Sequence, residues 1–150
     1  MDGMIVDPIM AKKFILAGKA VVTLVSLKSG KRYTYRIKLA PKKEGMHTAH
    51  FVNLLTGQDN DNDYSPLGII IEGRFFPTKA ARTRGISDST PSVIAIRYVL
   101  NDLMFNDTIN PMVEIWHAGR CGKCGRKLTV PESIATGLGP DCAGRMLMGQ

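Results

Sequence analysis

The chain has 150 residues, 44% hydrophobic and 22% charged, which suits one cored domain with a small appended module. Its net charge of +7 favours a polyanionic partner. No apolar run reaches the roughly 18 residues of a membrane helix, and the N-terminus lacks a secretory signal pattern, so we expect a cytoplasmic protein. Three cysteines in a reducing compartment argue against a disulfide framework and favour a metal site.

The first half of the chain predicts one helix and a series of strands. Asp7 as N-cap, Pro8 at the first helical position and Gly18 as a stop predict a short helix. Residues 20–27 and 31–39 flank the turn KSGK and are rich in β-branched and aromatic residues, so they predict a hairpin. Residues 48–55 and 67–76 predict two further strands.

The second half predicts a loop, a longer helix and a last strand. Residues 78–90 are polar and lack a hydrophobic period, which is typical of a mobile loop. Thr90 caps a helix that continues to about residue 105, with Val93, Ile96 and Leu100 on its apolar face. Residues 112–117 predict a strand. These elements indicate an α+β fold, a small curved antiparallel sheet packed on the second helix.

Charge is segregated along the chain. Residues 12–43 contain ten basic and no acidic residues, and residues 44–72 contain five acidic and no basic ones. In the predicted strand 31–39, alternation places Arg32, Thr34, Arg36 and Lys38 on one face, and Lys31, Tyr33, Tyr35 and Ile37 on the other. The basic face predicts phosphate contacts or a solvated surface. The tyrosines are either core residues or platforms for stacking bases.

The segment QDNDNDYSPLG, residues 58–68, does not fit a calcium loop. Counted from Asp61, a glutamate falls at the twelfth position, but Pro66 stands where glycine is required and the flanking segments are predicted strands. Alternating Asp and Asn residues are typical of a polar turn, and we expect one here. The alternative is a carboxylate metal cluster for phosphoryl chemistry.

The cysteines predict a structural zinc site near the C-terminus. Cys121 and Cys124 form a Cys-x-x-Cys pair in a glycine-containing turn, and Cys142 follows Gly139 and Pro140. We predict a Zn²⁺ ion bound by Cys121, Cys124, Cys142 and His117, because His117 closes a smaller loop than His47 or His50. The alternative is three unrelated thiols.

The residues around the cysteines predict an ordered C-terminal zinc-knuckle module. Thr129 and Glu132 form a capping box, and Gly137 ends the short helix that follows. Cys142 is expected in the first turn of another helix. We therefore divide the chain into an α+β core, residues 1–116, and a zinc-binding module, residues 117–150.

Residues 119–144 resemble a domain of unknown function found in bacteriophage and bacterial proteins. The shared pattern comprises Cys-x-x-Cys, Leu-Thr-x-Pro-Glu-Ser and Gly-x-Gly-Pro-x-Cys. Residues 23–37 and 51–68 are also similar to the segment that precedes this motif in short phage-encoded relatives. The resemblance implies a phage or mobile-element context, hence a host-cell cytoplasm, and a zinc-bound tail, but no activity.

Two functions remain after catalysis is set aside. The sequence has no phosphate-binding glycine loop, nucleophile elbow or His-Glu-x-x-His motif, so we expect the chain to have no catalytic activity. The favoured function is binding of nucleic acid, single-stranded DNA with low sequence specificity, through these residues: Arg32, Tyr33, Tyr35, Arg36, Lys38, Arg82 and Arg84. The alternative is a protein-binding module, such as a phage factor that engages or inhibits a host protein.

Overall fold

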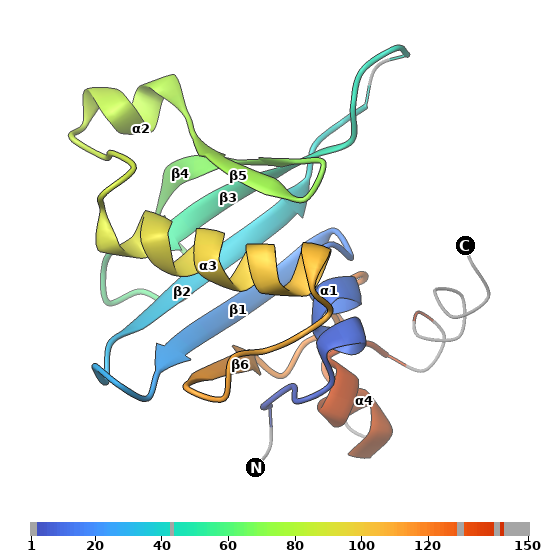
Figure 1. Ribbon diagram of the computed structural model, residues 1–150. Helices are drawn as coiled ribbons and strands as arrows, with labels where there is room; N and C mark the ends of the chain where they lie inside the picture. Colours follow the sequence, from blue (N-terminus) through green and yellow to red (C-terminus); the bar gives the residue numbers. More distant parts are fainter. Residues whose placement is uncertain (1–2, 43, 129–130, 140–141, 143–150) are drawn as a thin grey trace.

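The computed structural model describes residues 3–42, 44–128, 131–139 and 142 (Figure 1). The elements follow in the order α1 (Pro8–Ile15), β1 (Lys19–Ser26), β2 (Arg32–Leu39), β3 (Ala49–Leu55), β4 (Tyr64–Ile71), β5 (Arg74–Pro77), α2 (Lys79–Thr83), α3 (Pro91–Phe105), β6 (Val113–His117) and α4 (Pro131–Thr136). The α+β class expected from the sequence is confirmed.

The strands form one six-stranded antiparallel sheet in the order β5-β4-β3-β2-β1-β6. β1 to β5 form a meander, because each strand pairs with the next one along the chain. The chain then passes through α2 and α3 before β6 pairs with the free edge of β1. The N-terminal residues lie along β6, where the Ile5 N–H donates to the Ile115 carbonyl at 2.8 Å. The register shifts between Val52 and Asn53, whose partners are Gly68 and Pro66, so Leu67 is an extra residue in β4.

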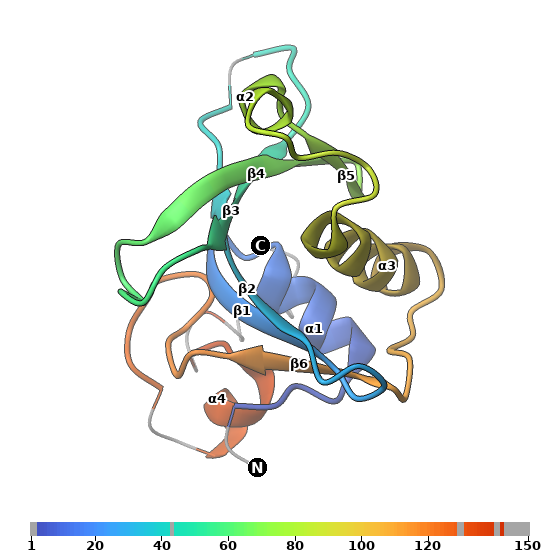
Figure 2. The ribbon, with the colours of Figure 1, turned by 90° about the vertical axis from the view of Figure 1, so that its left-hand side faces the viewer.

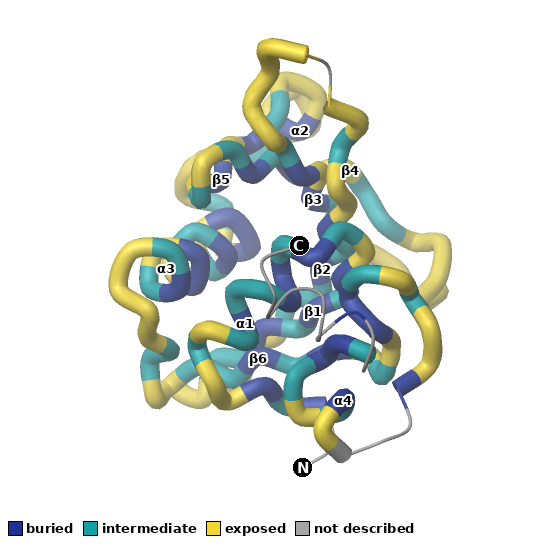
Figure 3. Tube along the Cα trace, turned by 90° about the vertical axis from the view of Figure 1, so that its right-hand side faces the viewer, coloured by how far each residue is buried: buried dark blue, intermediate teal, exposed yellow. Residues whose placement is uncertain are grey.

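Helices α1 and α3 lie on one side of the curved sheet (Figure 2). The core between them and the sheet contains fully buried side chains from both layers, including Phe14, Val22, Tyr35, Ile37, Val52, Ile70, Leu100 and Leu103. In Figure 3, α3 is buried on the side that faces the sheet and exposed on its outer side. Strand residues that point away from α1 and α3 are at most half-buried, so this is a single-sided sheet.

The predicted N-cap residue of α1 caps its helix with its side chain, whereas that of α3 does not. The Asp7 carboxylate accepts a hydrogen bond from the Ile9 N–H at 2.9 Å, which satisfies a free donor of the first turn. Thr90 is the N-cap residue of α3, but its hydroxyl accepts from the Ser87 N–H at 2.9 Å and not from the helix. It therefore stabilises the preceding turn.

Two predicted segments differ from the structure. The apolar run 67–76, predicted as one strand, is a hairpin of β4 and β5, because Glu72 and Gly73 both adopt positive φ (52° and 77°) in a tight turn. The predicted mobile loop 78–90 contains the helix α2. The Thr78 hydroxyl caps it by accepting from the Ala81 N–H at 3.3 Å, and Ala81 is fully buried.

The tail after β6 packs against α1. The Lys19 N–H donates to the Gly122 carbonyl at 2.6 Å, and the Gly122 N–H donates to the Gly137 carbonyl at 2.8 Å. Gly137 adopts a φ of 76° directly after α4, as its predicted role as a helix stop requires. The predicted cap at Thr129 lies outside the described residues, as do the immediate neighbours of Cys142. Of the described helices, none is long and apolar enough to cross a membrane.

Candidate functional site

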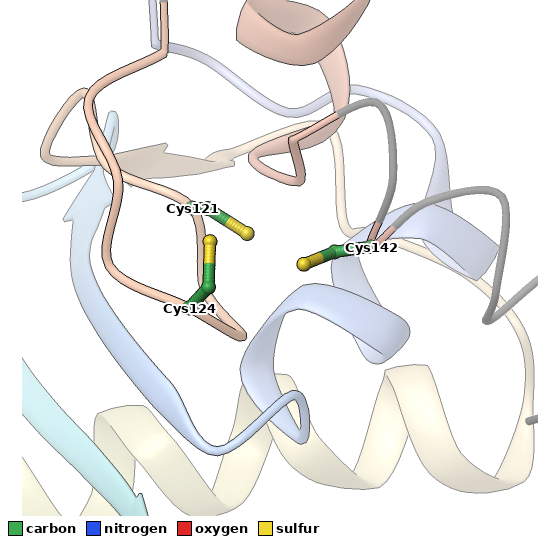
Figure 4. Close-up of side chains that lie close together, drawn as sticks. All are labelled: Cys121, Cys124 and Cys142. Carbon is green, nitrogen blue, oxygen red and sulfur yellow. The ribbon is translucent and has the colours of Figure 1, made fainter.

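The three cysteines converge at the end of α1 (Figure 4). The sulfur atoms of Cys121, Cys124 and Cys142 all lie within 4.8 Å of one another. Cys121 and Cys142 are buried and Cys124 is exposed. This spacing allows one metal ion to contact all three sulfurs, and a set of thiolate ligands suits zinc or another soft cation. The prediction that the three thiols gather in one site is confirmed.

A compact turn positions the first two thiols. The Gly125 N–H donates to the Cys121 carbonyl at 2.9 Å, and the Cys121 N–H donates to the Arg126 carbonyl at 2.8 Å. Gly125 has a φ of 79°, which a residue with a side chain adopts only at a cost. The Lys123 N–H points at the Cys121 sulfur at 3.4 Å. The turn is thus the knuckle expected from the Cys-x-x-Cys spacing.

The environment favours a thiolate at Cys121 and disfavours one at Cys142. Burial of the Cys121 thiol raises its pKa, but hydrogen bonds from the backbone N–H groups of Gly139, Cys124 and Lys123 outweigh burial and lower the pKa to about 7. Burial, together with hydrogen bonding to the other two thiols, raises the pKa of Cys142 to about 11. Three adjacent thiolates repel one another, so a bound cation is the group that would bring all three to the charged form.

His117 lies outside the three-cysteine group. Its Nδ1 accepts a hydrogen bond from the Gly119 N–H at 2.9 Å, so the neutral ring carries its proton on Nε2, which donates to the Ile134 carbonyl at 2.5 Å. The competing histidines are also engaged elsewhere: His50 Nε2 lies 3.0 Å from the Leu16 carbonyl, and His47 lies 3.1 Å from the Glu72 carboxylate. The three cysteines therefore leave one tetrahedral position for a further ligand.

Replacement of His117 by asparagine should leave the metal in place. The asparagine carbonyl can accept the Gly119 hydrogen bond, while the link to Ile134 is lost, so we expect a modest loss of stability of about 1–2 kcal/mol. Elemental analysis of the purified variant should give the same metal content per chain as the parent. Loss of metal from a folded His117→Asn protein would make His117 the fourth ligand.

Phe14 connects the main core to the tail that carries the three cysteines. It is fully buried, and its ring lies 6.0 Å from the His117 ring. Gly122 and Gly137 pack so closely on it that a Cβ at either position would come within 2.6 Å of the Phe14 Cδ1. Gly122 and Gly137 of the tail thus depend on α1 for their packing, because so short a segment builds little core of its own.

The basic face of β2 points away from the helices. Arg32 and Lys38 are exposed, Thr34 and Arg36 are half-buried, and Ile37 on the other face is fully buried. The expected alternation is therefore confirmed. The Arg36 guanidinium lies 4.0 Å from the centre of the Tyr64 ring and donates to the Asp61 carbonyl at 2.5 Å, so its position on the sheet is fixed.

The two tyrosines of β2 belong to the helix-covered face. Tyr35 is fully buried and its hydroxyl donates to the Ser92 carbonyl at 2.7 Å, while burial raises the pKa of this phenol. Tyr33 is half-buried and packs against the core. The prediction that Tyr35 contacts nucleic acid is wrong, because a ring without exposed surface cannot stack on a base. Tyr35 is a core residue, and Tyr33 lies at the edge of the core.

Arg82 and Arg84 stabilise the segment around α2. Arg82 and Arg97 both bind the Asp88 carboxylate, at 3.2 and 2.7 Å, and these hydrogen bonds lower the pKa of Asp88. Arg84 donates to the Pro66 carbonyl. Both residues nevertheless remain exposed. Arg82 and Arg84, which are predicted to contact nucleic acid, therefore belong to a segment held by an ion pair and a hydrogen bond, and not to a free loop.

The acidic segment forms a turn held together by its own side chains. The Asp59 carboxylate accepts from the Asp61 N–H at 2.9 Å and from the Asn62 side chain at 2.9 Å. Asp63 accepts from the Asp59 N–H at 2.8 Å. These bonds are the ones expected of a polar turn, and they bear out that interpretation.

Sequence reasoning missed two exposed phenylalanines on the open sheet face. Phe51 on β3 is 47% exposed and Phe76 on β5 is 46% exposed, although both belong to regular strands. Period-two alternation in the segment AHFVNLL could have identified Phe51, because its neighbours His50 and Val52 are buried. Phe76 was hidden by the assignment of 67–76 to one strand.

The comparison with protein families places the cysteine site in a recognised sequence unit. Residues 117–147 match DUF6011, a family of unknown function. The matched range contains all three cysteines of the cluster, which supports the resemblance noted for residues 119–144. The chain matches no curated protein and no solved structure. The DUF6011 match covers the tail only, so it assigns no role to the sheet.

Proposed function

We propose that this chain binds nucleic acid through the open face of its sheet, with a structural zinc ion in the tail. The observation that carries the proposal is the set of cationic side chains of Arg32, Arg36 and Lys38 on the face opposite α1 and α3. Cationic side chains on a single-sided sheet can reach the phosphates of one strand together. Such contacts position the nucleic acid without reading bases, so low sequence specificity follows.

Like charges on neighbouring strands support an anionic partner. Lys19 on β1 and Lys38 on β2 are direct cross-strand neighbours, and both are exposed. Like charges placed directly opposite each other destabilise a sheet. A phosphate between the two ammonium groups would remove this repulsion. The pair therefore fits a binding surface better than a merely solvated one.

The proposed role of zinc is to fold the tail onto α1. The three thiolates would hold the ion, and the backbone N–H groups around Cys121 would orient the first sulfur. Structural zinc contributes folding energy directly, which a segment of this length needs. We propose a binding role and not a catalytic one for the chain.

A groove on the helix side favours the alternative of a protein partner. A pocket of ≈ 410 Å³ opens between the end of the β1–β2 hairpin and α3, and its lining includes Tyr33, Ile94, Tyr98 and Met112. Ile94, Tyr98 and Met112 are about half exposed, at 52%, 48% and 48%. Exposed apolar residues around a groove are typical of a protein-binding site. The two candidate functions thus use opposite faces of the molecule.

Reversal of charge on β2 tests the proposed function. We expect the Arg32→Glu, Arg36→Glu, Lys38→Glu protein to bind an oligonucleotide more weakly and to show a salt slope flatter by about 2, since each lost phosphate contact removes about 0.7 to 0.9. Fluorescence anisotropy at several salt concentrations measures both quantities. The matched control changes the exposed lysines Lys28, Lys79 and Lys127 to glutamate, which alters the net charge equally but away from this row. Equal binding by the parent and the β2 variant would contradict the proposal.

A further inference from the structure

The exposed phenylalanines belong to one continuous row across five strands. In the pairing register, Lys19 is opposite Lys38, Lys38 is opposite Phe51, Phe51 is opposite Ile69, and Ile69 is opposite Phe76. We call these residues the Phe51–Phe76 row. Because directly paired residues point to the same face, all five side chains lie on the side of the sheet away from α1 and α3.

The composition of the row changes from charged to aromatic along its length. The ammonium groups of Lys19 and Lys38 lie at one end, and the rings of Phe51 and Phe76 flank the half-buried Ile69 at the other. Neighbouring strands lie 4.7 to 4.9 Å apart, so the two rings are about 10 Å apart along the row. Phe51 and Phe76 are each about half exposed, which makes this an exposed apolar patch beside a basic one.

We propose that the Phe51–Phe76 row binds single-stranded nucleic acid, with one base stacked on each phenylalanine ring and phosphates held by Lys19 and Lys38. This inference rests on the proposed function and names its substrate class. Unpaired bases offer their flat faces to aromatic rings on an open sheet, whereas the bases of a duplex are already stacked on one another. The row therefore selects single strands, while the basic residues of β2 supply binding to the backbone.

Charge argues against a second copy of the chain on this face. In a symmetric dimer through the sheet, Arg32, Arg36 and Lys38 of one chain would face the same region of the other chain, and like charges would be brought together. In a single-stranded nucleic acid, the phosphates can bind the lysines of the row and the bases can stack on its phenylalanines. It is the occupant that the residues fit.

The test replaces both rings and keeps every charge. The Phe51→Ala, Phe76→Ala protein should bind a fluorescein-labelled thymidine oligonucleotide of about 12 nucleotides at least about 25-fold more weakly than the parent, about 5-fold for each lost stack. Its salt slope should be unchanged, because no phosphate contact is removed. The Phe51→Tyr, Phe76→Tyr protein keeps both rings and should retain the parent affinity. Phe105→Ala is the matched control, since Phe105 on α3 is 49% exposed.

The outcomes separate this inference from the proposed function. Suppose that the parent binds, that the triple glutamate variant of β2 binds more weakly, and that the Phe51→Ala, Phe76→Ala protein binds as well as Phe105→Ala. The stacking inference is then overturned and the proposed function stands. If the parent does not bind any oligonucleotide, the proposed function fails and the inference fails with it. Equal losses for duplex and single strand, or a monomer–dimer equilibrium in sedimentation that only the alanine pair abolishes, would also overturn it.

Discussion

Replacement of Cys121 by serine should release the metal from the tail. Cys121 has the lowered thiol pKa and the most hydrogen-bonded sulfur of the cluster, so it is the ligand that the backbone is built to orient. Structural zinc is worth on the order of 10 kcal/mol in small zinc-dependent folds, so its loss should unfold the tail while the sheet remains folded. Elemental analysis should fall from one zinc per chain to none, and limited proteolysis should cleave after β6.

The His117→Asn protein is the control for this experiment. It removes the hydrogen bond to the Ile134 carbonyl without removing a sulfur, so it should keep the zinc that Cys121→Ser loses. The same loss is expected for Cys124→Ser and Cys142→Ser, because each removes one of the three thiolate ligands. A purified parent protein that contains no metal, or a Cys121→Ser protein that retains all of it, would contradict the proposed zinc site.

Replacement of Phe14 by alanine should be the most damaging change to the core. The side chain is fully buried and contacts both the main core and the glycines of the tail, so truncation leaves a cavity between two packed units. The free energy of unfolding should fall by about 3–5 kcal/mol, which urea denaturation measures. Limited proteolysis should also cleave the tail after β6 faster, because Gly122 and Gly137 lose the side chain against which they pack.

Phe105→Ala provides the comparison. It removes the same side chain from a position that is 49% exposed, where the Arg74 guanidinium lies 4.8 Å from the ring centre. Its expected cost is about 1 kcal/mol or less. Similar destabilisation by the two substitutions would show that Phe14 does not connect the core and the tail as described.

Local patterns predicted the parts of the site that depend on local geometry. The two-residue period of β2 placed Arg36 and Ile37 on opposite faces because strand geometry allows no other arrangement. The Cys-x-x-Cys spacing likewise implied a turn, and the distant Cys142 completed the cluster. Spacing within one strand or one turn determines this local geometry, whereas Cys142 reaches the other two cysteines only through the fold of the tail.

Local patterns leave undecided what tertiary contacts determine. His117 is close to Cys121 in sequence, but its ring nitrogens bind Gly119 and Ile134, and no local pattern specifies those partners. The turn at Glu72 and Gly73 was not predicted, because it lies within the apolar segment 67–76, whose composition predicts one continuous strand. A five-residue helix such as α2 is too short to show a hydrophobic period.

The central claim is that nucleic acid binds the open face of the sheet, and amide chemical-shift mapping tests it most directly. Titration of the zinc-loaded protein with a single-stranded thymidine oligonucleotide at low salt should shift the amide signals of Lys38, Phe51 and Phe76. The signals of Ile94 and Tyr98 on α3 should stay in place. Shifts confined to the α3 groove, or no shifts at all, would contradict the account.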